Sequence, residues 1–216
     1  MLIGECYVTD VTAKLPRHAM LTYERRPLAA VDTVVIHHVG AAERDYLAAE
    51  LAAFHVDVRL WPGIAYHFLI HPDGRIELTG EPDTVRWHAG RWNVRSLGVC
   101  LAGTFDRQAP TGRALSRCRQ LCEALSRHVG RPLAVRGHRD LPDTGYGPTD
   151  CPGRTWPTWR ALVMPGAASA PAKGPSPPAT GKPLTPSLSP AERERGAEGG
   201  VRVTLVPPAW PAWREA

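Results

Sequence analysis

A histidine and a cysteine lie thirteen positions apart in a segment rich in turn-forming residues, His138 and Cys151 in GHRDLPDTGYGPTDCPG at 137–153. The glycines and prolines between them predict a loop rather than a helix or strand. A loop can bring its two ends together, and an imidazole nitrogen with a thiolate sulfur is a donor pair that zinc prefers. A zinc centre that does chemistry needs three protein ligands and one open position, so the chain must supply a third ligand.

The best candidates for the third ligand are two adjacent histidines, His37 and His38, at the end of the run VDTVVIHH. Such a β-branched run is typical of a buried strand. Adjacent strand residues point to opposite faces of a sheet, so at most one of the pair can face the metal. The pattern does not choose between them, and both could instead be histidines that hydrogen-bond at the strand end.

The remaining elements must position these side chains. Strands alternate with helices, which predicts a single α/β domain over residues 1–164, with residues 1–29 as an arm or short strand. A turn at 71–74 predicts a hairpin, so the central β-sheet should be mixed and flanked by helices. The predicted strands are 31–37, 65–70, 75–78, 97–101 and 133–136, and the predicted helices are 42–54, 111–129 and 156–163.

The composition changes from residue 165 onward. Half of the 22 prolines lie in 165–216, among many Ala, Gly and Ser residues and without periodicity. Such a segment buries too little apolar surface to offset the entropy of ordering it, so we predict a disordered C-terminal tail.

Charge and cysteine usage narrow the function classes. A net charge of +5 favours an anionic partner, such as nucleic acid, a membrane surface or a cell-wall polymer. Scattered Lys and Arg and the lack of paired Cys/His finger spacing argue against nucleic acid. Five cysteines without a CxxC motif indicate free thiols, and Cys118 and Cys122 share a face of a predicted helix, which suits a core. With neither a signal peptide nor a transmembrane stretch, we expect a cytoplasmic protein.

Several motifs along the chain are weak singly and specific jointly. They are IHHVG at 36–40, AYHFLI at 65–70 with PDGRI at 72–76, WHAG at 87–90, SLGVCLAG at 96–103 and GHRD…TDCPG at 137–153. In order and spacing they resemble the zinc N-acetylmuramoyl-L-alanine amidases, a family that includes the phage amidase lysozymes and the peptidoglycan recognition proteins. The likeness spans about residues 31–160.

The resemblance implies a set of site residues. Zinc would be held by His37, His138 and Cys151, which selects the first histidine of the pair. Tyr66 stands where the family has a tyrosine at the reaction centre. Thr149 stands where phage enzymes often have a lysine and catalytic recognition proteins a threonine. The substrate-groove wall would fall on Trp87, His88 and Asn93.

The implied activity is hydrolysis of the amide bond between N-acetylmuramic acid and the L-alanine of the peptidoglycan stem peptide. Zinc lowers the pKa of a bound water to about 7 and polarises the carbonyl. The developing oxyanion needs a hydrogen-bond donor, and we expect Tyr66 to supply it or to hold the water, with Thr149 as a second hydroxyl. Some relatives carry a glutamate where this chain has Cys100, which leaves the general base open.

Alternative functions remain. The chain could be a non-catalytic module that binds peptidoglycan or muropeptides, although such recognition proteins lack the metal cysteine. Within the enzyme class, it could be an endolysin that reaches the cell wall on release or a cytoplasmic enzyme that recycles wall fragments. We expect a monomer in either role. We also expect His67 to point away from the metal and Asp140 to pair with Arg139 rather than orient a ligand histidine.

Overall fold

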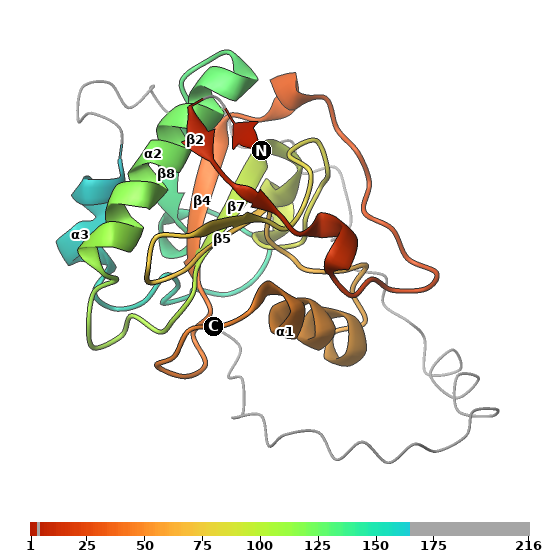
Figure 1. Ribbon diagram of the computed structural model, residues 1–216, viewed down its shortest axis with the longest axis horizontal. Helices are drawn as coiled ribbons and strands as arrows, with labels where there is room; N and C mark the ends of the chain where they lie inside the picture. The colour runs from red at the N-terminus through yellow and green to blue at the C-terminus, as the bar shows by residue number, and fades with distance from the viewer. Residues whose placement is uncertain (4, 165–216) are drawn as a thin grey trace.

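A six-stranded mixed sheet forms the centre of the domain in the computed structural model, which describes residues 1–3 and 5–164 (Figure 1). Its strand order is β3-β6-β5-β7-β4-β8. Neighbouring strands run parallel except in the β5–β6 hairpin, so the predicted mixed sheet is confirmed. The strands are β3 (Thr9–Asp10), β4 (Thr33–His38), β5 (Phe68–Ile70), β6 (Ile76–Leu78), β7 (Ser96–Leu101) and β8 (Ala134–Gly137).

Helices flank this sheet on both faces. Helix α2 (Gly112–Val129) and helix α3 (Trp156–Val163) pack on one face, where Val34 and Ile36 of β4 join a large hydrophobic cluster. Helix α1 (Ala48–Ala53) and several loops cover the other face. Because side chains alternate along a strand, Val35 and His37 belong to this second face.

Helices α2 and α3 match their predicted ranges. The Thr111 hydroxyl accepts a hydrogen bond from the Ala114 N–H and caps α2, and Gly130 ends it in the left-handed conformation (φ 82°) that glycine adopts without strain. Cys118 and Cys122 are buried against the sheet, as predicted. All five cysteines are free thiols.

The N-terminal segment forms a small hairpin beside α2, made by β1 (Leu2–Ile3) and β2 (Cys6–Tyr7). Short 3-10 turns follow at Thr12–Lys14 and Leu28–Ala30. The predicted disordered tail, residues 165–216, lies outside the described residues.

The helix predicted over 42–54 is wrong in its first half. Helix α1 begins only at Ala48 and continues as a π-helical turn, η3 (Phe54–Val58). Side chains hold the preceding segment as a loop: the Asp45 carboxylate accepts the Tyr46 N–H, and the Tyr46 hydroxyl accepts the Ala42 N–H. Hydrogen bonds of this kind compete with helical backbone pairing.

The strand predicted over 65–70 is also shorter in the structure. Only β5, Phe68–Ile70, is a strand, and Tyr66 and His67 precede it. The His67 N–H still donates to the Gly98 carbonyl, so the segment stays attached to β7. The segment that leads into β5 therefore positions Tyr66.

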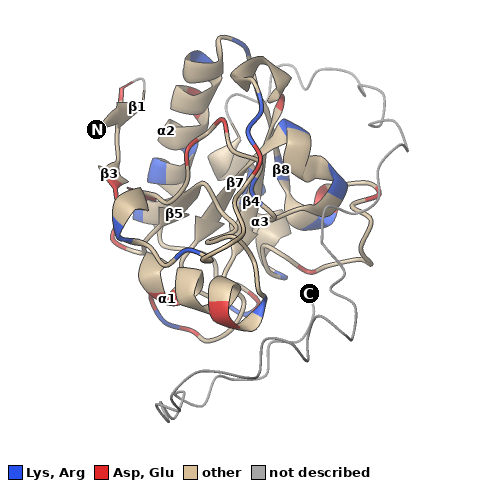
Figure 2. Cartoon of the chain, turned by 90° about the vertical axis from the view of Figure 1, so that its right-hand side faces the viewer, with Lys and Arg blue, Asp and Glu red and all other residues tan. Residues whose placement is uncertain are grey.

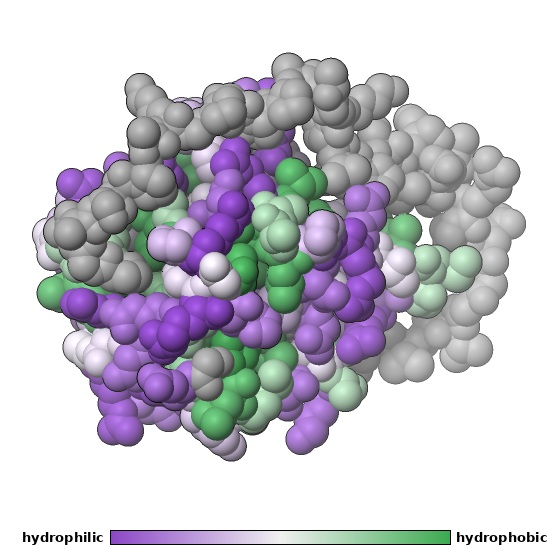
Figure 3. Space-filling view, turned by 90° about the horizontal axis from the view of Figure 1, so that it is seen from above, coloured by the Kyte–Doolittle hydropathy of each residue, from purple (hydrophilic) through white to green (hydrophobic). Residues whose placement is uncertain are grey.

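The described surface mixes charge and hydropathy. Figure 2 shows Lys and Arg positions spread over several elements with Asp and Glu among them. On the face in Figure 3, hydrophobic side chains show between hydrophilic ones. Within residues 1–3 and 5–164, no helix combines the length and hydrophobicity needed to cross a bilayer.

Candidate metal centre

Two neighbouring parallel strands bring His37 and His138 together. Ile36 of β4 is paired in register with Gly137 of β8, so the next residue of each strand lies at the same end of the sheet. His138 opens the 3-10 turn η5 (His138–Asp140), and its ring centroid lies 4.7 Å from that of His37. The parallel register therefore places two imidazoles side by side.

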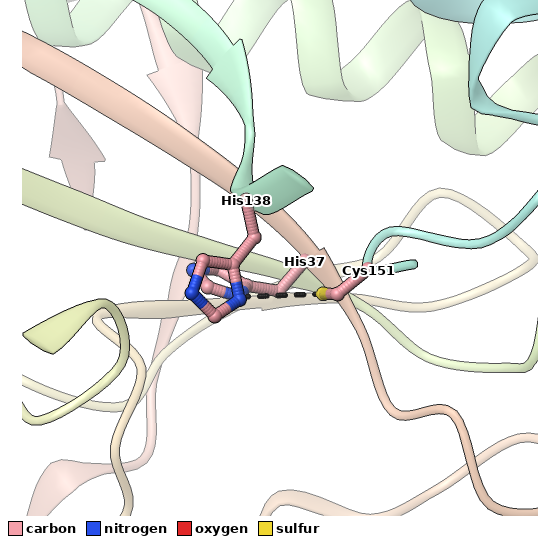
Figure 4. A group of neighbouring side chains, drawn as sticks. All are labelled: His37, His138 and Cys151. Carbon is pink, nitrogen blue, oxygen red and sulfur yellow. Dashed lines mark hydrogen bonds between the residues drawn. The ribbon is translucent and has the colours of Figure 1, made fainter. Parts of the chain in front are cut away.

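Cys151 completes the cluster from the loop that follows η5. The Cys151 Sγ lies 3.5 Å from the His37 Nδ1, and the three candidate ligand atoms all lie within 4.8 Å of one another (Figure 4). Zinc bond lengths and a tetrahedral angle require an N···S separation of roughly 3.6 Å. The spacing of His37 and Cys151 thus fits zinc.

Burial keeps the imidazoles of His37 and His138 neutral. His37 is 2% exposed, and burial beside His138 and His88 lowers its pKa well below the usual value. Burial likewise lowers the pKa of His138 to about 4. Both imidazoles therefore hold a free lone pair at neutral pH, as metal binding requires.

The buried thiol of Cys151 needs a positive charge beside it before it can ionise. Cys151 is 6% exposed, and burial raises its pKa to about 12, although the backbone N–H of His38 lowers it in part. A buried thiolate needs a compensating positive charge. A divalent cation held by the two imidazoles would supply that charge, so the donor set fits zinc chemically as well as geometrically.

His38 is not part of the cluster. Its ring lies on the opposite face of β4, 6.1 Å from the Phe105 ring, and its Nδ1 accepts the Phe105 N–H at 3.2 Å. The alternation of strand side chains thus separates the two adjacent histidines, and the first of them faces the candidate site.

Tyr66 lies beside the cluster. Its ring centroid is 5.2 Å from that of His37. Burial raises its pKa well above the usual value, and the thiols of Cys100 and Cys151 lie close by. Its hydroxyl interacts with the thiol of Cys100, which β7 places opposite His37 in the sheet register. Tyr66 is therefore a protonated donor at the edge of the site.

Thr149 holds the loop that carries the cysteine. Its hydroxyl oxygen accepts a hydrogen bond from the Cys151 N–H at 3.0 Å, a local contact that fixes the turn. Thr149 is half-buried, and its own O–H proton is not used in this bond. The residue thus positions Cys151 and keeps one donor for another group.

The three predicted wall residues occupy different positions. Trp87 is half-buried and contacts two other aromatic rings edge-on, Tyr23 at 5.8 Å and Trp61 at 6.2 Å. Asn93 is buried, and its Oδ1 accepts the N–H groups of His88 and Ala89. Trp87 is therefore a partly exposed ring packed among aromatic neighbours, whereas Asn93 holds the loop together.

His88 faces the metal cluster. Its Nδ1 lies 3.0 Å from the His37 Nε2, and the two rings meet edge to face. Sequence reasoning placed His88 on the groove wall and missed this contact, as it missed Tyr23 and Trp61. Neither aromatic could be singled out from the sequence, because the loops that carry Tyr23 and Trp61 have no periodic pattern.

The loop of His88 is joined to the loop that leads to Cys151. The Arg91 N–H donates to the Thr144 carbonyl at 2.9 Å, and the Trp92 Nε1–H donates to the Pro142 carbonyl at 2.9 Å. Gly90 lies at this contact because a Cβ there would come 2.0 Å from the Thr144 carbonyl oxygen. The wall and the cysteine loop therefore form one packed unit.

The structure corrects the expected pairing of Asp140 with Arg139. The Asp140 Oδ2 instead accepts hydrogen bonds from the Trp156 Nε1–H at 2.6 Å and the Gly137 N–H at 3.2 Å. Arg139 pairs with Asp150 at 3.6 Å. Asp140 thus anchors α3 to the end of β8 beside the candidate ligand His138.

His67 lies away from the candidate metal, as expected. Its Nδ1 accepts the Gly98 N–H, and its Nε2 contacts the Thr84 carbonyl at 2.9 Å. Both ring nitrogens are therefore used by the backbone.

Known proteins of similar sequence identify the family of this chain. Residues 27–154, more than half of the chain, match the family described as N-acetylmuramoyl-L-alanine amidase. The chain belongs to this amidase family. Peptidoglycan-recognition protein SC2 of Drosophila simulans is 30% identical over 140 residues, which cover 59% of this chain and 74% of that protein.

Two further comparisons describe the range of this amidase family. The N-acetylmuramoyl-L-alanine amidase of Sus scrofa is 31% identical over 151 residues, 62% of this chain but only 24% of that protein. The crystal structure of peptidoglycan recognition protein-LE in complex with tracheal cytotoxin, a monomeric peptidoglycan, superimposes with a TM-score of 0.59 at 28% identity. It covers 68% of this chain and 88% of its own. The family therefore includes both proteins named as enzymes and proteins named for recognition.

Proposed function

We propose that this chain is a zinc hydrolase that cleaves the amide bond between N-acetylmuramic acid and the L-alanine of the stem peptide. The observation that carries the proposal is the meeting of His37, His138 and Cys151, with donor spacing that suits zinc, in a chain of the amidase family. A chain that only bound peptidoglycan would not need a buried thiol beside two neutral imidazoles.

The residues around the cluster have separate roles in this reaction. Zinc, when bound, activates a water molecule and polarises the carbonyl of the amide. Tyr66 keeps its proton at neutral pH because burial raises its pKa, so it can donate to the oxygen that becomes negative. Thr149 offers a second, uncharged donor next to Cys151.

The wall beside the cluster would bind the substrate. Trp87 presents a half-buried aromatic face, supported by Tyr23 and Trp61, against which a sugar ring or peptide could pack. Asn93 and His88 are buried, so we assign them to the shape of the wall and not to its contact surface.

The alternative is a non-catalytic module that binds peptidoglycan or muropeptides. The relatives named as recognition proteins favour it, and one was crystallised with a monomeric peptidoglycan. The two functions differ in their products, because a module binds muropeptides without releasing free stem peptide.

Metal content and product release together test the proposal. The chain as purified, stripped with a chelator and refilled with zinc, should hold about one zinc ion and release stem peptide from soluble muropeptides. Cys151→Ala should hold no zinc and release none. Binding of muropeptides by the zinc-loaded chain without any release would assign it to the recognition class. Comparing intact sacculi with soluble muropeptides would then separate wall lysis, as by a released endolysin, from recycling in the cytoplasm.

A further inference from the structure

A buried row of polar groups leads from His37 away from the metal cluster. The His37 Nε2 lies 3.0 Å from the His88 Nδ1, and the His88 Nε2 lies 3.5 Å from the Ser96 Oγ. The Ser96 hydroxyl donates to the Trp92 carbonyl at 2.6 Å. All four residues are buried, so these groups have to satisfy one another.

The last group in the row decides where every proton lies. A backbone carbonyl can only accept, so the Ser96 hydroxyl proton points to Trp92. With its proton directed at Trp92, the Ser96 hydroxyl can only accept from His88, and so can the Ser96 carbonyl. The His88 Nε2 must therefore carry a proton. The His88 Nδ1 is left with a lone pair and accepts from His37.

The same logic fixes His37. A proton on its Nε2 leaves the lone pair on its Nδ1, and this is the atom that lies 3.5 Å from the Cys151 Sγ. We propose that His88 is a positioning residue that selects this tautomer of His37 and so prepares the ring to bind the metal before the metal arrives. The inference rests on the proposed zinc site. It does not rest on the reaction that the site performs.

The surroundings hold His88 in place for this role. Its backbone N–H is bound by the Asn93 side chain, and its ring packs directly on Gly98 of β7, where an added Cβ would come 2.8 Å from the ring. The backbone bond and the close seat on β7 together favour this one position of the ring. The orientation of a ligand histidine by a hydrogen bond to its second nitrogen typically changes metal affinity about 10- to 100-fold when removed.

A matched pair of substitutions separates the hydrogen bond from the bulk of the side chain. In His88→Asn, the amide oxygen replaces the ring Nδ1 as an acceptor, whereas His88→Leu has a similar shape and no acceptor. Zinc affinity of the full chain is measured by competition with a chromophoric chelator. Nitrogen-15 NMR of the zinc-free chain, labelled at histidine, reports which nitrogen of His37 carries the proton.

We expect His88→Leu to weaken zinc binding roughly 10- to 100-fold and to give His37 a mixture of tautomers. His88→Asn should stay within about threefold of wild type because one neutral hydrogen bond is kept. Ser96→Ala removes only the outer hydroxyl, so it should shift the His37 tautomer in the same direction with a smaller loss of zinc. This variant carries the test if His88→Leu fails to fold.

Two results would overturn the inference. One is a wild-type chain whose His37 already carries its proton on Nδ1. The other is a folded His88→Leu chain that binds zinc as tightly as wild type. If that chain also had a raised KM for muropeptides and no other change, His88 would be a substrate contact instead of a positioning residue. Zinc affinity and tautomer are measured without turnover, so a chain that binds zinc in this way and hydrolyses nothing would sink the proposed function alone.

Discussion

Gly98 gives the sharpest test of how the site is packed. It lies within β7 under the ring of His88, and a Cβ added there would come 2.8 to 3.0 Å from three ring atoms. Ordinary contacts of a Cβ begin at 3.4 Å, so Gly98→Ala requires the ring to move by several tenths of an ångström. A displacement of that size is enough to break the 3.0 Å contact between His88 and His37.

The expected magnitude follows from two opposing effects. Overpacking a buried site costs about 1–3 kcal/mol of unfolding free energy. Alanine in a strand interior regains about 0.5–1 kcal/mol because glycine loses more backbone entropy on folding. The balance is a destabilisation of about 0–2.5 kcal/mol, centred near 1 kcal/mol, and each kcal/mol lowers the melting temperature of a domain of this size by about 2–4 °C.

Circular dichroism melting and the zinc competition assay measure both consequences of Gly98→Ala. Gly112→Ala is the matched control, because a Cβ at the first residue of α2 would meet nothing within 4 Å. The control should bind zinc normally and melt at or above the wild-type temperature. If Gly98→Ala melts within about 1 °C of wild type and keeps its zinc affinity, the packing argument for His88 is refuted.

Three further outcomes can be checked by melting, turnover and denaturant titration. Cys151→Ser should abolish the rise in melting temperature that zinc gives the wild-type chain, since an uncharged hydroxyl is a poor zinc ligand; an undiminished rise would exclude Cys151 as a ligand. A chain ending at Met164 should keep wild-type turnover on soluble muropeptides, and a large loss would show that the tail belongs to the functional unit. The buried His71 ring lies between Asp45 at 2.8 Å and Glu77 at 3.2 Å, the second contact being an ion pair without hydrogen-bond angles. Burial lowers the His71 pKa, but the two carboxylates outweigh burial, so the net His71 pKa lies above 6.5. Burial raises the Glu77 pKa, but His71 and Arg75 together outweigh burial, so the net Glu77 pKa lies below 4.5. The His71 contribution to stability is lost as pH rises through its raised pKa and the Glu77 contribution as pH falls through its lowered pKa, so this cluster stabilises most between about pH 4.5 and 6.5. Denaturant titrations across pH should show His71→Gln flattening the alkaline side of the profile, and an unchanged profile would contradict the reasoning.

Much of the framework could be predicted because it rests on periodic patterns. The β-branched run that ends at His37 is a strand because it is buried on both faces, and α2 has both a capping Thr111 and a terminating Gly130. The parallel pairing of β4 and β8 then brings His37 to His138, a contact that the sequence pattern of neither strand alone predicts. The choice of His37 over His38 came from family resemblance, and strand alternation agrees with it.

The errors and omissions arose where side chains act across loops. Asp45 and its neighbours hold 41–47 out of the helix by hydrogen bonds that a composition rich in Ala, Leu and Glu does not reveal. Asp140 bonds to Trp156, sixteen residues later, in preference to its neighbour in sequence. The contact between His88 and His37 joins a loop residue to a strand residue fifty-one positions away. Periodicity carries no information about such contacts.

The three candidate ligands come from parts of the fold that differ in burial and in their place relative to the sheet. His37 lies near the end of an interior strand, β4, that is buried along its whole length. By contrast, β8, which leads to His138, is an edge strand that is mostly half-buried, and Cys151 follows on a loop. Edges of this kind open in partial fluctuations long before a protein unfolds as a whole. We therefore expect local opening of the edge strand β8 to set the rate at which a bound ion is released. Amide protons of β8 should exchange faster than those of β4 and should slow most when the ion is present.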